Sequence, residues 1–265
     1  MVFDLEPIIL RNFPAFVVGS PRSGTSILVD ALLAAGYNGY REGNFLTLVA
    51  TIETAVERHF NIYANGNSAV LASVVDKQRL LAKLRDVFKT TADALNPKHP
   101  WFDKTGNPEM LTILPTIKQM WPDAVFVFAK RRAIENVGSR LKKFPSHTFE
   151  YHCSDWAKNM AVWRDVRPRL PAGSYIEVDQ QDMIQHPEQV ARSLATLLDL
   201  DEATAQAVQT TFQRNRPQQT SEGSAARIDS LAGVAWNDNQ KDIFRRVCGP
   251  ELEAYGYSTD DQYWR

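Results

Sequence analysis

The chain has 265 residues, with 30 Lys and Arg against 31 Asp and Glu, so its formal charge is −1. That length is typical of one domain with a sizeable hydrophobic core, and the balanced charge argues against a general nucleic-acid binder. The two cysteines, Cys153 and Cys248, are too few and too far apart for a disulfide framework or a zinc site. No apolar run approaches the ~20 residues that cross a bilayer, and residues 1–11 lack the pattern of a signal peptide. We therefore predict one cytoplasmic domain over residues 1–265, without a membrane span.

The chain opens with the pattern strand, glycine-rich loop, helix. Residues 15–18 form a short, continuous apolar run that is typical of a buried parallel strand, and the run ends at Gly19. Apolar residues then recur at helical spacing over residues 26–35, and Gly36 follows as a C-cap. A second short strand is expected at residues 38–41.

A helical insert follows, over about residues 45–97. Residues 45–59 and 68–95 have helical periodicity, and residues 65–67 (Asn-Gly-Asn) break the pattern between them. These helices are rich in Leu, Val and Ala. We expect the insert to lie beside the carboxyl edge of the sheet and to form part of a substrate pocket.

The rest of the chain alternates strands with helices. Further strands are expected at residues 100–103, 124–129 and 174–178. Further helices are expected at residues 110–120, 133–143, 154–167, 187–200, 202–215 and 239–255. Trp156, Met160 and Trp163 recur at helical spacing, which indicates a core stripe. This alternation predicts an α/β domain with a mainly parallel sheet.

The loop after the first strand, from Gly19 to Ser26, is the strongest functional signal in the sequence. Its glycines let the backbone approach a ligand closely, and successive N–H groups at a helix N-terminus bind an anion. The spacing of the glycines is that of a nucleotide P-loop, but Thr25 stands where an NTPase has the Lys that reaches the β- and γ-phosphates. The cation lies earlier, at Arg22. The loop therefore suits a smaller anion than a triphosphate; a tight turn without a ligand is the alternative.

Residues 16–28 resemble the 5′-phosphosulfate loop of the P-loop sulfotransferases, in the Pro-Arg-Ser-Gly-Thr form of bacterial and tyrosylprotein-type members. The resemblance implies a three-layer α/β P-loop fold with a central, mainly parallel sheet flanked by helices. It also implies transfer of a sulfuryl group from 3′-phosphoadenosine-5′-phosphosulfate (PAPS) to an acceptor hydroxyl or amine, which leaves PAP and needs no metal. Five loop residues would then bind the donor: Arg22, Ser23, Gly24, Thr25 and Ser26.

A second motif tests this resemblance, which implies a strand that ends in Arg and a Ser eight residues later. The expected strand at residues 124–129 leads into Arg131, and Ser139 lies eight residues further on. Arg binds a phosphate through two parallel hydrogen bonds, and Ser adds a donor from the following helix. Arg131 and Ser139 would therefore hold the 3′-phosphate of the donor. Because Arg132 stands where the family often has Asp, the choice between the two arginines stays open, as does a solvated basic helix start.

Sulfuryl transfer needs a base for the acceptor and cations for the charge on the departing oxygen. Glu42, after the second expected strand, lies where many family members place a catalytic carboxylate; an exposed loop Glu is the alternative. Lys104 belongs to a segment that resembles the family's Asp/Glu-Lys-Thr signature, and Lys104 and Arg22 are the candidate catalytic cations. The cytosolic small-molecule branch has a catalytic His directly after this signature. Gly106 stands there in this chain, which favours Glu42 as the base.

Other polar residues are less specific. One of three arginines would add a donor contact, without an assignment: Arg214, Arg216 or Arg227. We interpret His99, His147 and His152 as surface-loop residues.

The sequence thus predicts a PAPS-dependent sulfotransferase that acts by in-line transfer. The acceptor would be a small molecule, a lipid or a glycan, and a nucleic-acid partner is not expected. Two alternatives stay open. One is a metal-dependent P-loop kinase of a small molecule, which Thr25 disfavours, and the other is a PAP- or PAPS-binding module without turnover.

Overall fold

The computed structural model describes residues 13–97, 100–214 and 229–265. Within these residues the chain forms a five-stranded sheet in the order β2-β3-β1-β4-β5, and every pairing is parallel. The strands are β1 (Ala15–Val18), β2 (Asn38–Tyr40), β3 (Trp101–Thr105), β4 (Val125–Lys130) and β5 (Tyr175–Asp179). The helices are α1 (Thr25–Ala34), α2 (Thr47–Tyr63), α3 (Leu71–Val74), α4 (Lys77–Leu95), α5 (Pro108–Thr112), α6 (Leu114–Met120), α7 (Ala133–Lys143), α8 (Phe149–Val166), the 3-10 turn η1 (Arg167–Arg169), α9 (Gln180–Gln185), α10 (Pro187–Leu198), α11 (Glu202–Arg214) and α12 (Asp238–Ala254).

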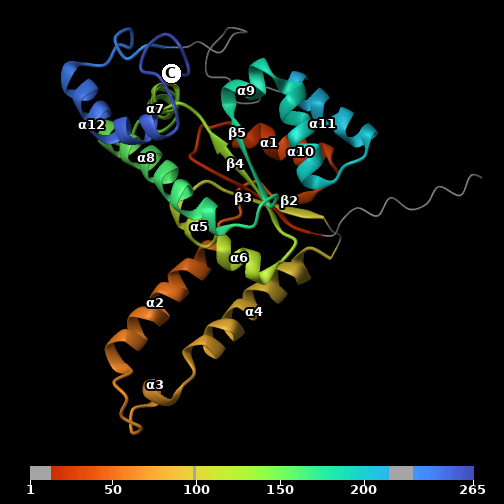
Figure 1. The fold of residues 1–265 in the computed structure, drawn as a ribbon, viewed down its shortest axis with the longest axis vertical. Helices are drawn as coiled ribbons and strands as arrows, with labels where there is room; N and C mark the ends of the chain where they lie inside the picture. The colour runs from red at the N-terminus through yellow and green to blue at the C-terminus, as the bar shows by residue number, and fades with distance from the viewer. Residues whose placement is uncertain (1–12, 98–99, 215–228) are drawn as a thin grey trace, which may run out of the picture.

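Helices cover both faces of the sheet (Figure 1). Along β1, Phe16 and Val18 face a core built with α5, α6, α7, α8 and α12, whereas Ala15 and Val17 face a second core built with α1, α10 and α11. Because both faces are buried, the continuous apolar runs in β1 and β4 are what a central parallel strand requires. The predicted three-layer α/β architecture is confirmed.

Three local features differ from the expected elements. The helix expected at residues 110–120 divides into α5 and α6, because Pro115 lies in the first turn of α6 and cannot donate the backbone hydrogen bond of a helix interior. The short helix α9, not expected, follows β5 directly, with Asp179 as its N-cap. Helix α8 begins earlier than expected because Thr148 caps it. His152 therefore lies in a helix, and its interpretation as a surface-loop residue was wrong, since it is fully buried.

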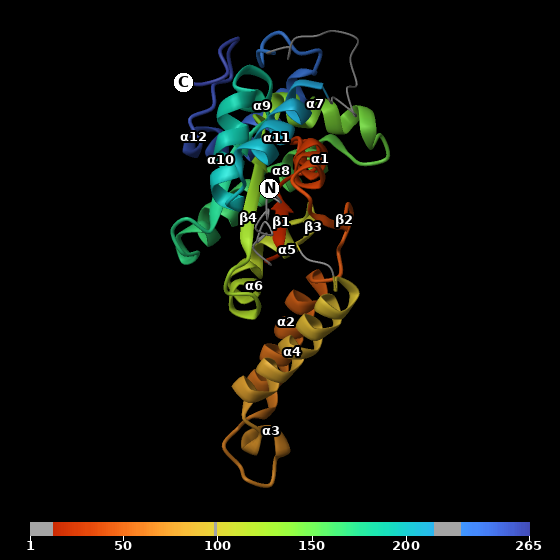
Figure 2. The ribbon, with the colours of Figure 1, turned by 90° about the vertical axis from the view of Figure 1, so that its right-hand side faces the viewer.

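The helical insert was expected to lie beside the carboxyl edge of the sheet, but it extends away from the sheet as an arm (Figures 1 and 2). Helix α2 leads outward, α3 lies at the far end, and α4 returns. The ion pairs Lys77–Glu57 (2.7 Å) and Arg85–Glu53 (2.6 Å) join α2 to α4. In these helices, which the structure describes in full, the buried residues are Val49, Leu81 and Ala92. None of the helices in the described part of the chain combines the length and hydrophobicity that crossing a bilayer requires.

Candidate active site

The predicted site residues meet at the carboxyl edge of the sheet. The P-loop follows β1, Glu42 follows β2, Lys104 lies near the end of β3, and Arg131 follows β4. In the order β2-β3-β1-β4, the P-loop therefore lies between the Glu42 and Lys104 side and the Arg131 side. The carboxyl edge of an open parallel sheet is the usual place for a ligand.

The backbone of the P-loop is tightly constrained. A Cβ at Gly19, whose φ is 125°, would lie 2.2 Å from the carbonyl oxygen of Ala129, so β4 leaves room only for glycine. A Cβ at Gly24 would lie 2.5 Å from the Cε atom of Met183. Arg22 adopts a φ of 73°, which is unusual for a residue with a side chain and carries local strain. Such strain is concentrated in loops that bind ligands.

The two predicted donor motifs contact each other directly. The Nε atom of Arg22 donates to Ser139 Oγ at 2.9 Å, and the Nη1 atom of Arg131 donates to the carbonyl oxygen of Arg22 at 3.2 Å. The Nε atom of Arg131 is buried and has no hydrogen-bond partner among the described residues. Burial is the main cause that lowers the pKa of Arg131, and the charge of Arg22 lowers it further. Two neighbouring cations and an unused donor suit an anionic ligand.

Helix α7 also supplies two P-loop contacts that the sequence analysis missed. The fully buried Asn136 donates through Nδ2 to the carbonyl oxygen of Pro21 and to Ser23 Oγ, both at 3.0 Å. Arg140 donates through Nη1 to Ser20 Oγ at 3.0 Å. Polar residues spaced by three and four along a helix next to a phosphate loop are the signal that could have found them.

Arg140 in turn ties the P-loop to helix α8. It forms an ion pair with Asp155 at 2.7 Å, and its Nε atom donates to Nδ1 of His152 at 3.4 Å. The Nε2 atom of His152 donates to the carbonyl oxygen of Phe144 at 3.2 Å. Burial, and next the charge of Arg140, lower the pKa of His152, which keeps the ring neutral and able to accept from Arg140.

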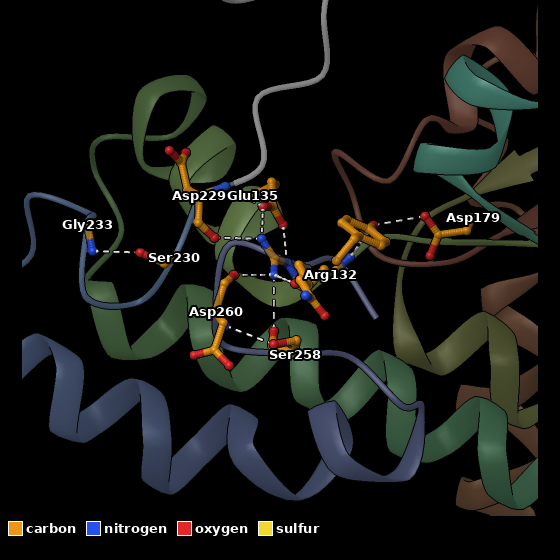
Figure 3. Close-up of polar contacts among 10 residues, drawn as sticks. Arg132, Glu135, Asp179, Asp229, Ser230, Gly233, Ser258 and Asp260 are labelled. Carbon is orange, nitrogen blue, oxygen red and sulfur yellow. Dashed lines mark hydrogen bonds and ion pairs between the residues drawn. The ribbon is translucent and has the colours of Figure 1, made fainter. Parts of the chain in front are cut away.

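Arg132, the alternative to Arg131, is fully buried and bound to other parts of the chain (Figure 3). All three of its guanidinium nitrogens are in use. It pairs with Glu135 and donates to four backbone carbonyl oxygens: Asp229 (2.6 Å), Ser258 (3.2 Å), Asp260 (2.9 Å) and Gln262 (2.8 Å). Of the two arginines, only Arg131 has a guanidinium nitrogen left for a ligand.

The C-terminal segment also binds the end of β5. Asp179 accepts hydrogen bonds from the hydroxyls of Tyr257 (2.5 Å) and Tyr263 (2.8 Å), and the Tyr263 hydroxyl accepts from the backbone N–H of Arg132 at 2.9 Å. Burial raises the pKa of Asp179 to about 6. This network fixes the backbone from which Arg131 extends.

On the other side of the P-loop, Glu42 and Lys104 form an ion pair. The Lys104 side chain is 10% exposed, whereas that of Glu42 is 72% exposed. The two groups therefore lie together at the edge of β2 and β3, with the carboxylate on the solvent side. Gly106 packs against the P-loop, since a Cβ there would lie 3.2 Å from the carbonyl oxygen of Gly19. A larger residue at that position would press on the loop.

A buried carboxyl group supports the loop that carries Glu42. Asp103 accepts a hydrogen bond from Thr105 Oγ1 at 2.6 Å, and Thr105 Oγ1 accepts from the backbone N–H of Asn44 at 3.0 Å. A Cβ at Gly43 would lie 1.8 Å from an oxygen of Asp103, so the loop is packed directly on this carboxyl group. Burial raises the pKa of Asp103 to about 6.

The remaining predicted residues have varied positions. Thr25 and Ser26 lie in the first turn of α1. Arg216, Arg227 and His99 lie outside the described residues, and the side chain of Arg214 does as well. Among the described residues, no three His, Cys, Asp or Glu side chains cluster so as to hold a metal.

Comparison with known proteins agrees with this fold. The model of the sulfotransferase family matches residues 14–204, and the chain belongs to that family. Among solved structures, the chain is similar to sulfotransferase STF9 from Mycobacterium avium, with 13% identity and a TM-score of 0.54 over 94% of this chain and 76% of that one. It is also similar to the sulfotransferase domain of the Synechococcus PCC 7002 olefin synthase, with 14% identity and a TM-score of 0.52 over 95% of this chain and 98% of that one. A comparison with curated proteins gives no significant match.

Proposed function

We propose that the protein, as a single domain, transfers a sulfuryl group from PAPS to a hydroxyl or amine of an acceptor. The observation that carries the proposal is the contact between the P-loop and the β4–α7 motif. Arg22 Nε donates to Ser139 Oγ at 2.9 Å, and the neighbouring Arg131 has a buried Nε without a partner in the described part of the chain. Two anion-binding positions next to each other match a donor that has both a 5′-phosphosulfate and a 3′-phosphate.

The donor would be divided between these two positions. Residues Arg22 to Ser26, with the backbone N–H groups that open α1, would bind the 5′-phosphosulfate. Arg131 and Ser139 would bind the 3′-phosphate, and the Arg22–Ser139 hydrogen bond would be replaced by bonds to the ligand. Thr25, in place of the Lys of an NTPase, supports this donor over a nucleoside triphosphate.

The reaction itself would take place between the P-loop and the Glu42–Lys104 pair. Glu42 takes the proton as the acceptor O–H or N–H bond breaks. The sulfur then bonds to the acceptor oxygen or nitrogen, and its bond to the bridging oxygen of the donor breaks on the opposite side. Lys104 and Arg22 stabilise the negative charge that develops on that oxygen. The proposal gives no role to a metal.

The acceptor would approach from the solvent side of Glu42, near the base of the arm. Phe45 and Leu48, which follow Glu42 closely, are 39% and 48% exposed. This end of the arm supplies an apolar wall next to the proposed base. These exposed apolar side chains support an acceptor that has an apolar part. Such an acceptor would be a small molecule, a lipid or a glycan.

The first test needs no acceptor. Thermal unfolding is measured with PAP, with 5′-AMP, and with ATP and Mg²⁺, because a ligand at about 100 times its Kd adds about 2.7 kcal/mol of stability. We expect PAP to raise the Tm, and 5′-AMP to raise it less for lack of the 3′-phosphate. Stabilisation by ATP and Mg²⁺ alone would identify a kinase instead. Binding of PAPS without transfer in an acceptor screen would identify a binding module.

A further inference from the structure

The far end of the arm is apolar and exposed. We define the arm tip as residues 60–76, which include α3 and lie at the end of the arm away from the sheet (Figures 1 and 2). Five large apolar side chains of the tip are exposed: Ile62 (58%), Tyr63 (53%), Leu71 (74%), Val74 (59%) and Val75 (37%). The tip contains no Lys, Arg, His or Glu. Its single acidic residue, Asp76, caps α4 by accepting from the backbone N–H of Arg79 at 3.0 Å.

Three polar side chains of the tip, Asn65, Asn67 and Ser73, accept hydrogen bonds from its own backbone. Ser73 Oγ accepts from the backbone N–H groups of Asn65 (3.0 Å) and Gly66 (3.2 Å). The side chain of Asn65 accepts from the N–H of Asn67 at 3.0 Å, and that of Asn67 accepts from the N–H of Ala69 at 2.9 Å. These three side chains thus pair with the backbone of the tip, while its large aliphatic side chains face solvent. Backbone groups that are already paired lower the cost of entering an apolar medium.

Basic residues follow directly behind the tip. Residues 57–59, near the end of α2, and residues 77–83, at the start of α4, hold Arg58, Lys77, Arg79 and Lys83 against one acid, Glu57. Glu57 pairs with Lys77 at 2.7 Å. Arg58, Arg79 and Lys83 are exposed. We call these three residues the basic collar; they give the arm a positive band that is complementary to anionic headgroups.

We propose that the arm tip inserts into the headgroup region of a membrane that carries anionic lipid. The apolar side chains would enter the interface, Tyr63 would lie at its level, and the basic collar would contact the headgroups. A folded protein partner would instead be matched by polar and charged groups around the tip's apolar residues, and the tip has no charge besides the capping Asp76. Helix α2 has 17 residues, so the tip lies about 25 Å beyond the base of the arm at 1.5 Å per residue. The catalytic edge would therefore be held above the membrane surface. This proposal does not depend on the sulfuryl-transfer reaction.

Vesicle co-sedimentation of the whole protein tests the proposal. We expect it to bind vesicles of phosphatidylcholine mixed with phosphatidylglycerol, and to bind phosphatidylcholine alone more weakly. Salt should weaken the binding, because it screens the collar, without abolishing it. A Tyr63→Trp variant should show a blue shift of its added tryptophan emission with the anionic vesicles.

A matched pair of variants separates tip insertion from general stickiness. Leu71→Ser/Val74→Ser changes two exposed apolar residues of the tip, and Val87→Ser/Leu95→Ser changes two of α4 that are exposed to a similar degree, 60% and 65%. We expect the tip variant to lower the apparent vesicle affinity by roughly tenfold or more and the α4 variant to leave it unchanged. Arg79→Gln/Lys83→Gln should reduce binding to the anionic vesicles and leave binding to phosphatidylcholine vesicles unchanged. Circular dichroism checks that each variant is folded.

Two results would overturn the proposal. The first is no binding of the parent protein to either kind of vesicle. The second is equal binding by the parent and the tip variant. A concentration-dependent dimer in light scattering that the tip variant abolishes, without vesicle binding, would assign the tip to a second copy of this chain instead.

Discussion

The two sides of the active site differ in how firmly the fold holds them. We call the P-loop with Arg131, Asn136 and Ser139 the buried half, and Glu42 with Lys104 the open half. In the buried half, Asn136 is fully buried, Ser139 is 7% exposed, and hydrogen bonds link α7 to the loop. In the open half, Glu42 is 72% exposed. In the proposed reaction, the anion site would therefore be formed before the donor binds, whereas the acceptor would complete the surroundings of the base.

The largest expected effect is in the open half. Glu42→Gln removes the proposed base and keeps its size, so turnover should fall by about 10²–10⁴. The affinity for PAP, which is proposed to bind in the buried half, should stay within about twofold, since no proposed donor contact is lost. Single-turnover rates with an acceptor from a screen, together with PAP titration, check both parts. Full activity of the variant would remove Glu42 from the mechanism.

The next largest effect is a loss of stability on replacing Arg132, which lies next to the buried half. Arg132→Ala leaves the Glu135 carboxylate and four carbonyl oxygens without their donor, so the free energy of unfolding should fall by about 3–5 kcal/mol. Urea unfolding measures this loss. Arg245→Ala, on the exposed face of α12, is the control and should change stability by less than about 0.5 kcal/mol. Equal effects of the two variants would contradict the structural role of Arg132.

Arg131→Ala, in contrast to Arg132→Ala, should weaken ligand binding more than it lowers the free energy of unfolding. It removes the guanidinium with the unused Nε, so the Kd for PAP should rise by roughly 10- to 150-fold, or about 1.5–3 kcal/mol. The Kd for 5′-AMP, which lacks the 3′-phosphate, should change much less. Calorimetric titration of both ligands checks the contrast. An equal loss for both would place Arg131 elsewhere than at the 3′-phosphate.

The smallest effect is expected on replacing Asp103, the buried residue on which the loop of the open half packs. The folded-state pKa of Asp103 is about 6, above its ordinary value of 3.8, so the folded state binds its proton more tightly than the unfolded state. Ionised Asp103 therefore costs stability, fully above pH 6 and progressively less as the pH falls toward 4. Asp103→Asn removes that cost and should stabilise the protein by about 1 kcal/mol at pH 8, below the ~3 kcal/mol that the pKa difference allows.

The gain from Asp103→Asn should shrink as the pH is lowered from 8 to 5. Urea unfolding at both values measures it, beside Asp123→Asn at an exposed position, which should change little at either. Destabilisation by Asp103→Asn at pH 8 would mean that the ionised carboxyl group itself holds the loop that carries Glu42.

Much of the fold and of the buried half could be predicted because their signals are local. The run before Gly19 and the helical pattern after it define a strand–loop–helix unit. Arg131 comes just before α7, and Ser139 lies in that helix eight residues later. The structure brings both motifs into contact. The roles of these residues in binding and catalysis stay predictions.

The features that were missed depend on contacts across the chain. The choice between Arg131 and Arg132 depends on the C-terminal segment, which binds Arg132, and no local pattern encodes that pairing. The interpretation of His152 as a loop residue was wrong because Thr148 caps α8 and the helix therefore includes His152. Helical periodicity also predicted the arm helices but not their direction, since periodicity identifies an apolar face without identifying what covers it.

The contacts of the buried half also bear on how the protein folds. Arg22 and Ser139 are 117 residues apart, and Arg132 and Ser258 are 126 apart, whereas Lys77 and Glu57 of the arm are 20 apart. A contact between residues far apart in the sequence closes a longer chain loop, which costs more entropy than a short loop. Such a contact therefore forms more slowly. Pulse-labelled hydrogen exchange should therefore detect protection in the arm before protection in the P-loop. Because the anion site would form late, its ligand should slow unfolding while leaving the refolding rate nearly unchanged.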